Sequence, residues 1–187
     1  MGSPGGPGDA IDWSAWHLTD EEDRGESPAH ELIRQNCLEC LMVLGERRHW
    51  RGRFIGADAF FGWREDQPLV RVSPDVYVVP NAPSPLPEMW QTWLAGHAPP
   101  TFALEVVSKD RVKEYLVNPE KYAALGALEL VIYDPDGVGR RTAGKRVHRL
   151  TRYSRGSDGA FVLSECSDDV IYSPELEVFL IAMGGAQ

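Results

Sequence analysis

Two acidic residues occupy strand-like segments in which a carboxylate is costly. Glu105 interrupts the run FALEVVS, whose apolar and β-branched composition is typical of a strand buried on both faces. Asp75 follows Pro74 at the start of DVYVV, a second β-branched run. A buried carboxylate is tolerated when a cation, a metal ion or a hydrogen-bond network faces it. Each acid therefore predicts a partner elsewhere in the chain.

One hard divalent cation could serve both acids. If their strands pair side by side, Asp75 and Glu105 converge, and oxygen ligands with retained waters are the usual shell of Mg²⁺ or Mn²⁺. Such an ion polarises a phosphodiester and lowers the pKa of an attacking water. The alternative for Asp75 is a strand-end aspartate that accepts backbone N–H groups. For Glu105 it is a buried ion pair with Lys113, Lys121 or an arginine.

The elements that would position these acids alternate between strand and helix. A strand, a crossover helix and a parallel strand are predicted between Thr101 and Asp134, with Gly126 as the C-cap of the helix. Residues 50–80 have the pattern of a β-meander, and residues 145–181 add further strands and hairpins. This order predicts an α/β fold with a mixed β-sheet core flanked by helices.

Length and composition predict a flexible leader, residues 1–26, followed by a single domain, residues 27–187. The leader is rich in Gly, Pro and acids, and only Trp13 and Trp16 could dock it onto a body. An N-terminal amphipathic helix should begin at Ser27 and run to about Gly45. No apolar run reaches the roughly 18 residues of a membrane span, and no signal-peptide pattern is visible. We therefore expect a cytoplasmic protein without a membrane partner.

A C-x-x-C pair, Cys37 and Cys40, lies inside this predicted helix at the spacing of its apolar residues. A structural zinc site needs two further ligands, and Cys166 with scattered histidines offers no second pair. Core cysteines are therefore favoured over metal ligands.

The net charge of −9 argues against nucleic-acid binding by charge alone. The charge is unevenly distributed, however. Between Gly137 and Arg155 the chain carries basic residues and no acid: Arg140, Arg141, Lys145, Arg146, Arg149, Arg152 and Arg155. A second basic cluster consists of Arg47, Arg48, Arg51 and Arg53. A solvated hairpin with cationic faces is slightly favoured over a phosphate-contacting surface.

Four segments together resemble the Uma-type restriction endonucleases, a bacterial branch of the PD-(D/E)XK nuclease superfamily. They are SPAHELIRQNCLECL, SPDVYVVP, LEVVS and PEKYAALGALELVIYDPD. The resemblance implies a restriction-endonuclease-like fold, a Mg²⁺ or similar ion, and phosphodiester hydrolysis. It implies that Asp75 and Glu105 are the motif acids and that Glu31 is a candidate for an additional metal-binding carboxylate on the first helix.

The motif lysine is where the chain departs from this resemblance. The superfamily places it two residues after the glutamate, where this chain has Val107. Uma-type members typically move it to the following helix, four residues before the tyrosine matched by Tyr122, and here that residue is Asn118. Lys121 and Lys113 are nearby but out of register, and a flexible stem could still bring Lys121 to the site. The resemblance also implies an acid four residues before the lysine position, which Glu114 matches.

Two functions follow from these residues. The main hypothesis is a Mg²⁺-dependent DNA endonuclease in which Asp75 and Glu105 bind the ion and Lys121 or Lys113 assists. The alternative is a catalytically weakened nuclease fold that acts as a nucleic-acid-binding or assembly subunit. The out-of-register lysine and the acidic net charge favour the alternative, whereas the acid pair favours the enzyme. Cutting both strands of a duplex would need two sites, so the family analogy favours a homodimer.

Overall fold

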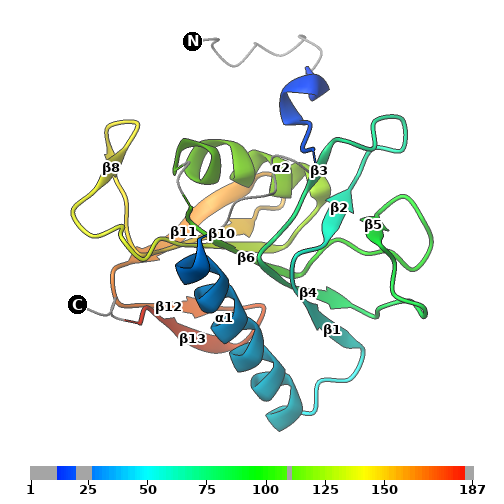
Figure 1. Ribbon diagram of the computed structural model, residues 1–187, viewed down its shortest axis with the longest axis horizontal. Coiled ribbons are helices and arrows are strands. Elements are labelled where there is room, and N and C mark those ends of the chain that lie inside the picture. The colour runs from blue at the N-terminus through cyan, green and yellow to red at the C-terminus, as the bar shows by residue number, and fades with distance from the viewer. Residues whose placement is uncertain (1–11, 20–26, 109–110, 184–187) are drawn as a thin grey trace.

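A six-stranded mixed sheet forms the centre of the computed structural model, which describes residues 12–19, 27–108 and 111–183 (Figure 1). Its strands lie in the order β1-β4-β6-β7-β10-β11. Their bounds are Arg53–Gly56 (β1), Val76–Pro80 (β4), Phe102–Val106 (β6), Glu129–Tyr133 (β7), Leu150–Arg155 (β10) and Phe161–Ser167 (β11). β6 and β7 are parallel, and the other neighbouring pairs are antiparallel. The predicted α/β fold with a mixed sheet is confirmed.

The parallel pair β6 and β7 is joined by the predicted helical crossover. It consists of a π-helical turn, η2 (Lys113–Val117), and the helix α2 (Asn118–Leu125). The predicted C-cap, Gly126, has φ 97°, a left-handed conformation that glycine adopts at little cost. Because the strands are parallel, the carboxyl ends of β6 and β7 meet at one edge of the sheet.

The helix α1 (Pro28–Arg47) packs on one face of the sheet with the hairpin β12 (Val170–Ser173) and β13 (Val178–Ile181) (Figure 1). The Ser27 side chain caps α1 by accepting the N–H of His30 at 3.2 Å, which places the start of the helix at the predicted residue. This face buries Leu41, Val76, Val78, Phe102, Leu104, Val131, Leu150, Ile171 and Leu176.

The apolar stripe of α1 is narrower than its spacing predicts. Cys37 packs against the core as expected, but Cys40 is exposed and 62% of the Leu32 surface is accessible. The core role predicted for Cys40 is therefore wrong, because α1 contacts the sheet through fewer positions than its sequence pattern offers.

The opposite face of the sheet is covered by η2, α2 and a three-stranded sheet ordered β3-β2-β5. These short strands are Arg71–Val72 (β3), Phe60–Gly62 (β2) and Met89–Gln91 (β5). Phe61 stacks on Trp90 with ring centroids 5.5 Å apart, and the Trp90 indole donates to the Tyr77 hydroxyl at 3.2 Å. Offset aromatic contacts of this kind add to the burial of their large surfaces.

Part of the predicted leader packs on this body. A short helix, η1 (Trp13–Trp16), precedes an isolated bridge from His17 to Val70, and Leu18 is buried. Residues 12–19 therefore differ from the flexible leader expected over residues 1–26, since apolar side chains anchor them. The rest of that leader lies outside the described residues, and the domain boundary before residue 27 stays a prediction.

The remaining two strands, β8 (Arg141–Thr142) and β9 (Lys145–Arg146), form a hairpin that projects from the edge of the molecule (Figure 1). Within the described part of the chain, no helix is both long enough and apolar enough to cross a membrane.

Candidate active site

Asp75 and Glu105 lie opposite one another where the pairing of β4 and β6 ends. The register joins Val76 to Leu104 in an antiparallel ladder, so one further step places Asp75 across from Glu105. Directly opposite residues of such a ladder point to the same face, with Cβ atoms about 4.5–5.5 Å apart. Both acids are buried, at 6% and 7% exposure. The structure thus brings together the two acids that the sequence singled out.

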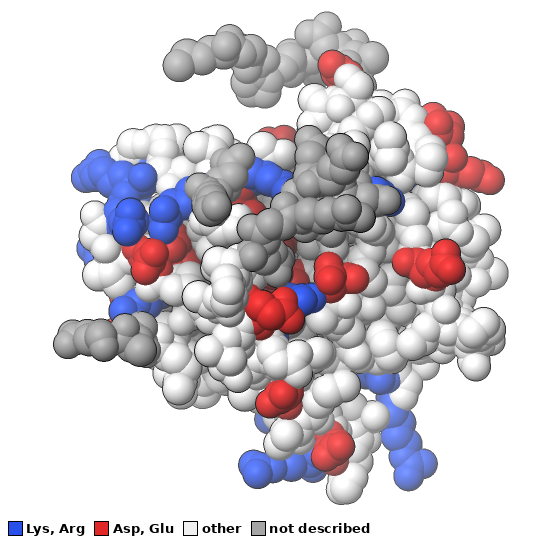
Figure 2. Space-filling view, viewed as in Figure 1, with Lys and Arg blue, Asp and Glu red and all other residues white. Residues whose placement is uncertain are grey.

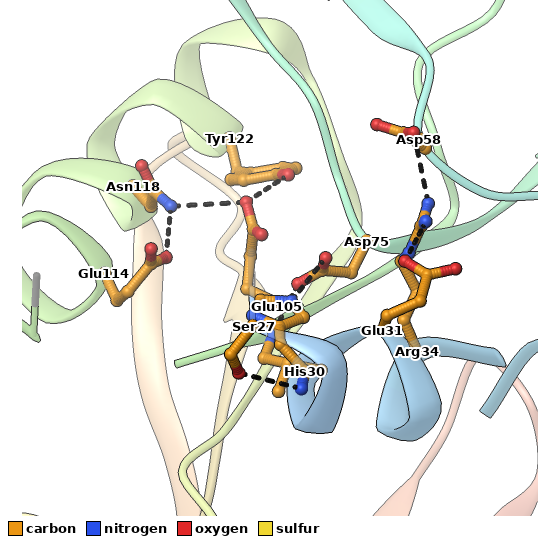
Figure 3. Close-up of polar contacts among 11 residues, drawn as sticks. Ser27, His30, Glu31, Arg34, Asp58, Asp75, Glu105, Glu114, Asn118 and Tyr122 are labelled. Carbon is orange, nitrogen blue, oxygen red and sulfur yellow. Dashed lines mark hydrogen bonds and ion pairs between the residues drawn. The ribbon is translucent and has the colours of Figure 1, made fainter. Parts of the chain in front are cut away.

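The Asp75 carboxylate is held by one donor from α1 and one from β6 (Figure 3). Its Oδ1 lies 2.9 Å from Nε2 of His30, a buried side chain in the first turn of α1. Its Oδ2 accepts the backbone N–H of Val106 at 2.6 Å. The alternative of a strand-end aspartate bound to a backbone N–H therefore describes one of its oxygens. His30 contacts the other oxygen, and the sequence did not predict that this histidine contacts Asp75.

The Glu105 carboxylate faces a stripe of three residues on the crossover (Figure 3). Its Oε1 accepts the Tyr122 hydroxyl at 2.6 Å and the Asn118 amide at 3.2 Å. The same Asn118 nitrogen donates to Oε2 of Glu114 at 2.6 Å. These three partners are spaced four residues apart and so lie along one face of a helix. That spacing is the signal by which the sequence could have identified Tyr122 as a donor to Glu105.

Burial and neighbouring charges together disfavour the ionised form of Glu105. Removal from water raises the pKa of Glu105 well above its ordinary value, and the charges of Glu114 and Asp75 raise it further. The Tyr122 hydrogen bond and the charge of Lys113 act in the opposite direction. Burial and the neighbouring Glu105 also raise the pKa of Tyr122. Three acids therefore lie close together here, and their closeness favours the protonated form of Glu105.

The two candidate lysines take different positions. Lys113 is half-buried in η2, and its positive charge lowers the pKa of Glu105. Lys121 is buried and donates to the backbone carbonyl of Trp16 at 3.1 Å, which ties α2 to η1. The structure thus gives Lys121 a contact with the N-terminal segment that the sequence did not predict. Val107, at the superfamily lysine position, packs in the apolar core.

Glu31, the predicted additional ligand, takes part in a surface ion-pair network. It pairs with Arg34, which also contacts Oδ2 of Asp58 at 3.2 Å (Figure 3). Over residues 12–19, 27–108 and 111–183, no group of three or more His, Cys, Asp and Glu side chains could hold a metal ion. Arg34 engages the Glu31 carboxylate, and the role of Glu31 as an additional ligand stays a prediction.

A cavity of about 510 Å³ opens at the carboxyl ends of β6 and β7 and reaches the first turn of α1. Its lining includes Ser27, His30, Val106, Val107, Arg111 and Asp134. Arg111 donates two hydrogen bonds, of 2.9 and 3.1 Å, to the Asp134 carboxylate. The α1 N-terminus and Arg111 are the groups of this lining that attract anions, whereas Asp134 and Asp136 are acids of the same lining.

The pairing of Arg111 with the buried Asp134 was not predicted from the sequence. Asp134 directly follows β7, the parallel neighbour of the Glu105 strand, and that position was the available signal.

The donor set at Asp75 and Glu105 fits a hard divalent cation. Mg²⁺ is usually held by one or two carboxylates, with waters and substrate phosphates completing its shell. The structural support is the cluster of buried acids, since burial and the charges of Glu114 and Asp75 make the ionisation of Glu105 costly. A cation bound at the acid pair would offset that cost.

Comparisons with known proteins identify the family and the fold. The sequence profile of the Uma2 family, described as "Putative restriction endonuclease", matches residues 21–180. Among solved structures, the chain is similar to a "putative nuclease belonging to DUF820" from Anabaena variabilis ATCC 29413, with a TM-score of 0.57 and 11% identity. The match covers 85% of this chain and 80% of that one. It shows a nuclease fold, as the sequence predicted. The search of curated proteins found no match. Because the family profile spans most of the chain, this protein belongs to the Uma2 family of restriction endonuclease-like proteins.

Proposed function

We propose that this protein is a divalent-metal-dependent DNA endonuclease that hydrolyses phosphodiester bonds at the Asp75–Glu105 pair. The observation that carries the proposal is the opposition of these two buried acids across the end of the β4–β6 ladder. The family description supports a nuclease, and DNA is the substrate that this description implies. The ion would be Mg²⁺ or Mn²⁺, with Asp75 and Glu105 as its protein ligands.

Each proposed ligand has a set of orienting residues. His30 and the Val106 N–H hold Asp75, whereas Tyr122 and Asn118 hold one oxygen of Glu105. A divalent ion bound there would polarise the phosphodiester and lower the pKa of an attacking water. Fixed ligands reduce the reorganisation needed at that step.

Lys113 is our candidate for the catalytic lysine. Its charge already acts on Glu105, and a cation beside the acid pair would offset charge that develops on a scissile phosphate. The cavity beside His30, with Arg111 and the α1 N-terminus, would accept a phosphate of the same strand. Lys121 remains a second candidate, but its ammonium group bonds to Trp16.

The test is cleavage of supercoiled plasmid, linear duplex and single-stranded DNA in Mg²⁺, Mn²⁺ or EDTA. Wild type should cut in the presence of metal, and Asp75→Asn and Glu105→Gln should not. Glu120→Gln is a matched control, because Glu120 is an exposed acid on the same crossover helix. Cleavage that persists in both site variants would exclude the acid pair as the active site.

One observation favours a second function, a nuclease fold that binds nucleic acid without cutting it. At the position where Uma-type members typically have lysine, the neutral Asn118 amide joins Glu105 to Glu114. In that case no substrate would be cut, yet duplex DNA would bind. Mn²⁺ would raise the Tm of wild type but not of Asp75→Asn.

A homodimer and a cytoplasmic location complete the proposal. Two acid-pair sites related by a two-fold axis would reach both strands of a duplex. Light scattering after size exclusion measures the mass directly, and a monomer that nonetheless makes double-strand breaks would contradict the dimer.

A further inference from the structure

The β8–β9 hairpin concentrates positive charge on a protein of net charge −9. Four of its basic residues are exposed: Arg140, Arg141, Lys145 and Arg146. Figure 2 shows Lys and Arg side chains gathered at the side of the molecule where this hairpin projects in Figure 1. No acid occurs from Gly137 to Ser157, so the charge is not neutralised within the hairpin itself.

The register of the hairpin places like charges face to face. Arg141 pairs with Arg146 directly across the two-stranded ladder. Like charges at opposed positions destabilise a ladder, and a two-stranded hairpin is only marginally stable. Arg146 is partly compensated by Asp168 at 2.9 Å, whereas Arg141 makes no ion pair with the described residues. The arrangement is unfavourable in isolation and becomes favourable when an extended polyanion lies along the hairpin.

The base of the hairpin is fixed next to the candidate active site. Asp134, Pro135 and Asp136 line the cavity, and the chain continues from them straight into the hairpin. Val147 is buried in the core, and the Tyr115 hydroxyl of η2 donates to the carbonyl of His148 at 3.1 Å. The segment that leads into the cationic hairpin thus also forms part of the cavity wall.

The second basic cluster differs from the hairpin in position and in contacts. This cluster lies where α1 ends and β1 begins. Because α1 has 20 residues, this end of the helix lies about 30 Å from its N-terminus. In Figure 2, the Lys and Arg side chains at the lower end of the molecule lie apart from those on the side of the hairpin. Arg48 is paired with Glu177, and Arg53 donates to the carbonyl of Glu175. Two of its members are therefore engaged by the protein itself.

We propose that the exposed face of the β8–β9 hairpin binds the phosphate backbone of duplex DNA and holds the duplex across the cavity. This inference rests on the proposed function, because it names the substrate contact of that same site. Phosphate neutralisation by Lys and Arg supplies most non-specific affinity for DNA, and a local cationic arm lets an acidic protein obtain it. An extended hairpin also contacts several phosphates at once, which a single arginine in the cavity does not.

The experiment measures binding of a short fluorescent duplex by anisotropy in EDTA, across a series of NaCl concentrations. The hairpin variant is Arg141→Gln with Lys145→Gln, chosen because the Arg141 side chain bonds only within the hairpin and the Lys145 side chain makes no hydrogen bond or ion pair with the described residues. The control is Arg47→Gln with Arg51→Gln, which removes the same charge at the far end of α1. Arg141→Lys conserves the charge, and the Tm of each variant reports its folding.

The hairpin variant should bind about tenfold more weakly or worse at 0.1 M salt, with the slope of log K against log salt reduced by about 2. The control and Arg141→Lys should bind within about twofold of wild type. Equal losses in hairpin and control variants, or no duplex binding by wild type, would overturn the proposal. Weaker binding by the hairpin variant in a protein that cuts no DNA with Mn²⁺ would support the hairpin surface and count against the endonuclease alone.

Discussion

Asn118 donates its side-chain amide to Glu105 at 3.2 Å, from a position at which Uma-type members typically have lysine. The same nitrogen satisfies Glu114, so one neutral group serves two buried acids. An amide supplies hydrogen bonds but no charge to balance them. The substitution therefore leaves positive charge at the site to Lys113 and to any bound metal ion. This contact also links the crossover to the strand that carries the acid pair.

Replacing Lys113 by methionine should lower the rate of metal-dependent cleavage by about tenfold or more, since it removes the cation that acts on Glu105. The methionine keeps most of the apolar stem. The rate constant for plasmid nicking at saturating Mn²⁺ measures the effect, and the Tm should change little.

Lys121→Met is the matched control for that variant. Loss of the bond to Trp16 should lower the Tm while the nicking rate of the folded enzyme stays near that of wild type. If Lys121→Met abolishes nicking and Lys113→Met does not, the assignment of the lysine is reversed.

Converting Asn118 to aspartate should destabilise the fold, because it would place a third carboxylate against Glu105 and Glu114. Asn118→Ala removes the same hydrogen bonds without adding charge and should cost about 1–3 kcal/mol. Urea denaturation gives both free energies of unfolding. The aspartate variant should be the less stable of the two at neutral pH, and the difference should shrink as acid protonates the carboxylates. The opposite order would show that Asn118 does not separate two acids.

The sequence was informative about the acid pair for a physical reason. A charged residue within a β-branched run is costly wherever the strand lies, so Glu105 and Asp75 are conspicuous without knowledge of their neighbours. The crossover could also be predicted from the sequence, because a strand, a helix ending at Gly126 and a second strand are each defined by a local pattern. Both features depend on residues close together in the chain.

Contacts between distant segments could not be predicted from the sequence in the same way. Whether Lys121 points toward Glu105 or toward Trp16 depends on where residues 12–19 pack, which no local pattern encodes. Glu31 had the right chemistry for a ligand, but it pairs with Arg34, which also contacts Asp58 across an α1–loop contact. Likewise, His30 could be placed on a helix, yet its bond to Asp75 depends on how that helix crosses the sheet.

His30→Ala should weaken metal binding by freeing one oxygen of Asp75 from its fixed orientation. His30→Gln, which can still donate, should restore part of the affinity. The readout is the Mn²⁺-induced rise in Tm, compared with that of Asp75→Asn as the variant without the ligand. A full Mn²⁺ response in His30→Ala would exclude a positioning role for the histidine.

Glu129 gives the fold a pH dependence that is independent of the candidate site. It is buried at the start of β7, where Ser173 donates to it and Arg152 lies 3.8 Å away, and burial raises its pKa to about 7. The folded state therefore favours the protonated acid. The stability that this preference contributes is fully present below pH 4.5 and is lost as the pH rises through about 7, a change of up to about 3 kcal/mol.

Glu129→Gln keeps a hydrogen-bonding side chain of the same size without the titration. Its free energy of unfolding, measured by urea denaturation from pH 4.5 to 8, should vary less than that of wild type over this range. Parallel pH profiles for the two proteins would show that Glu129 does not titrate in the folded state.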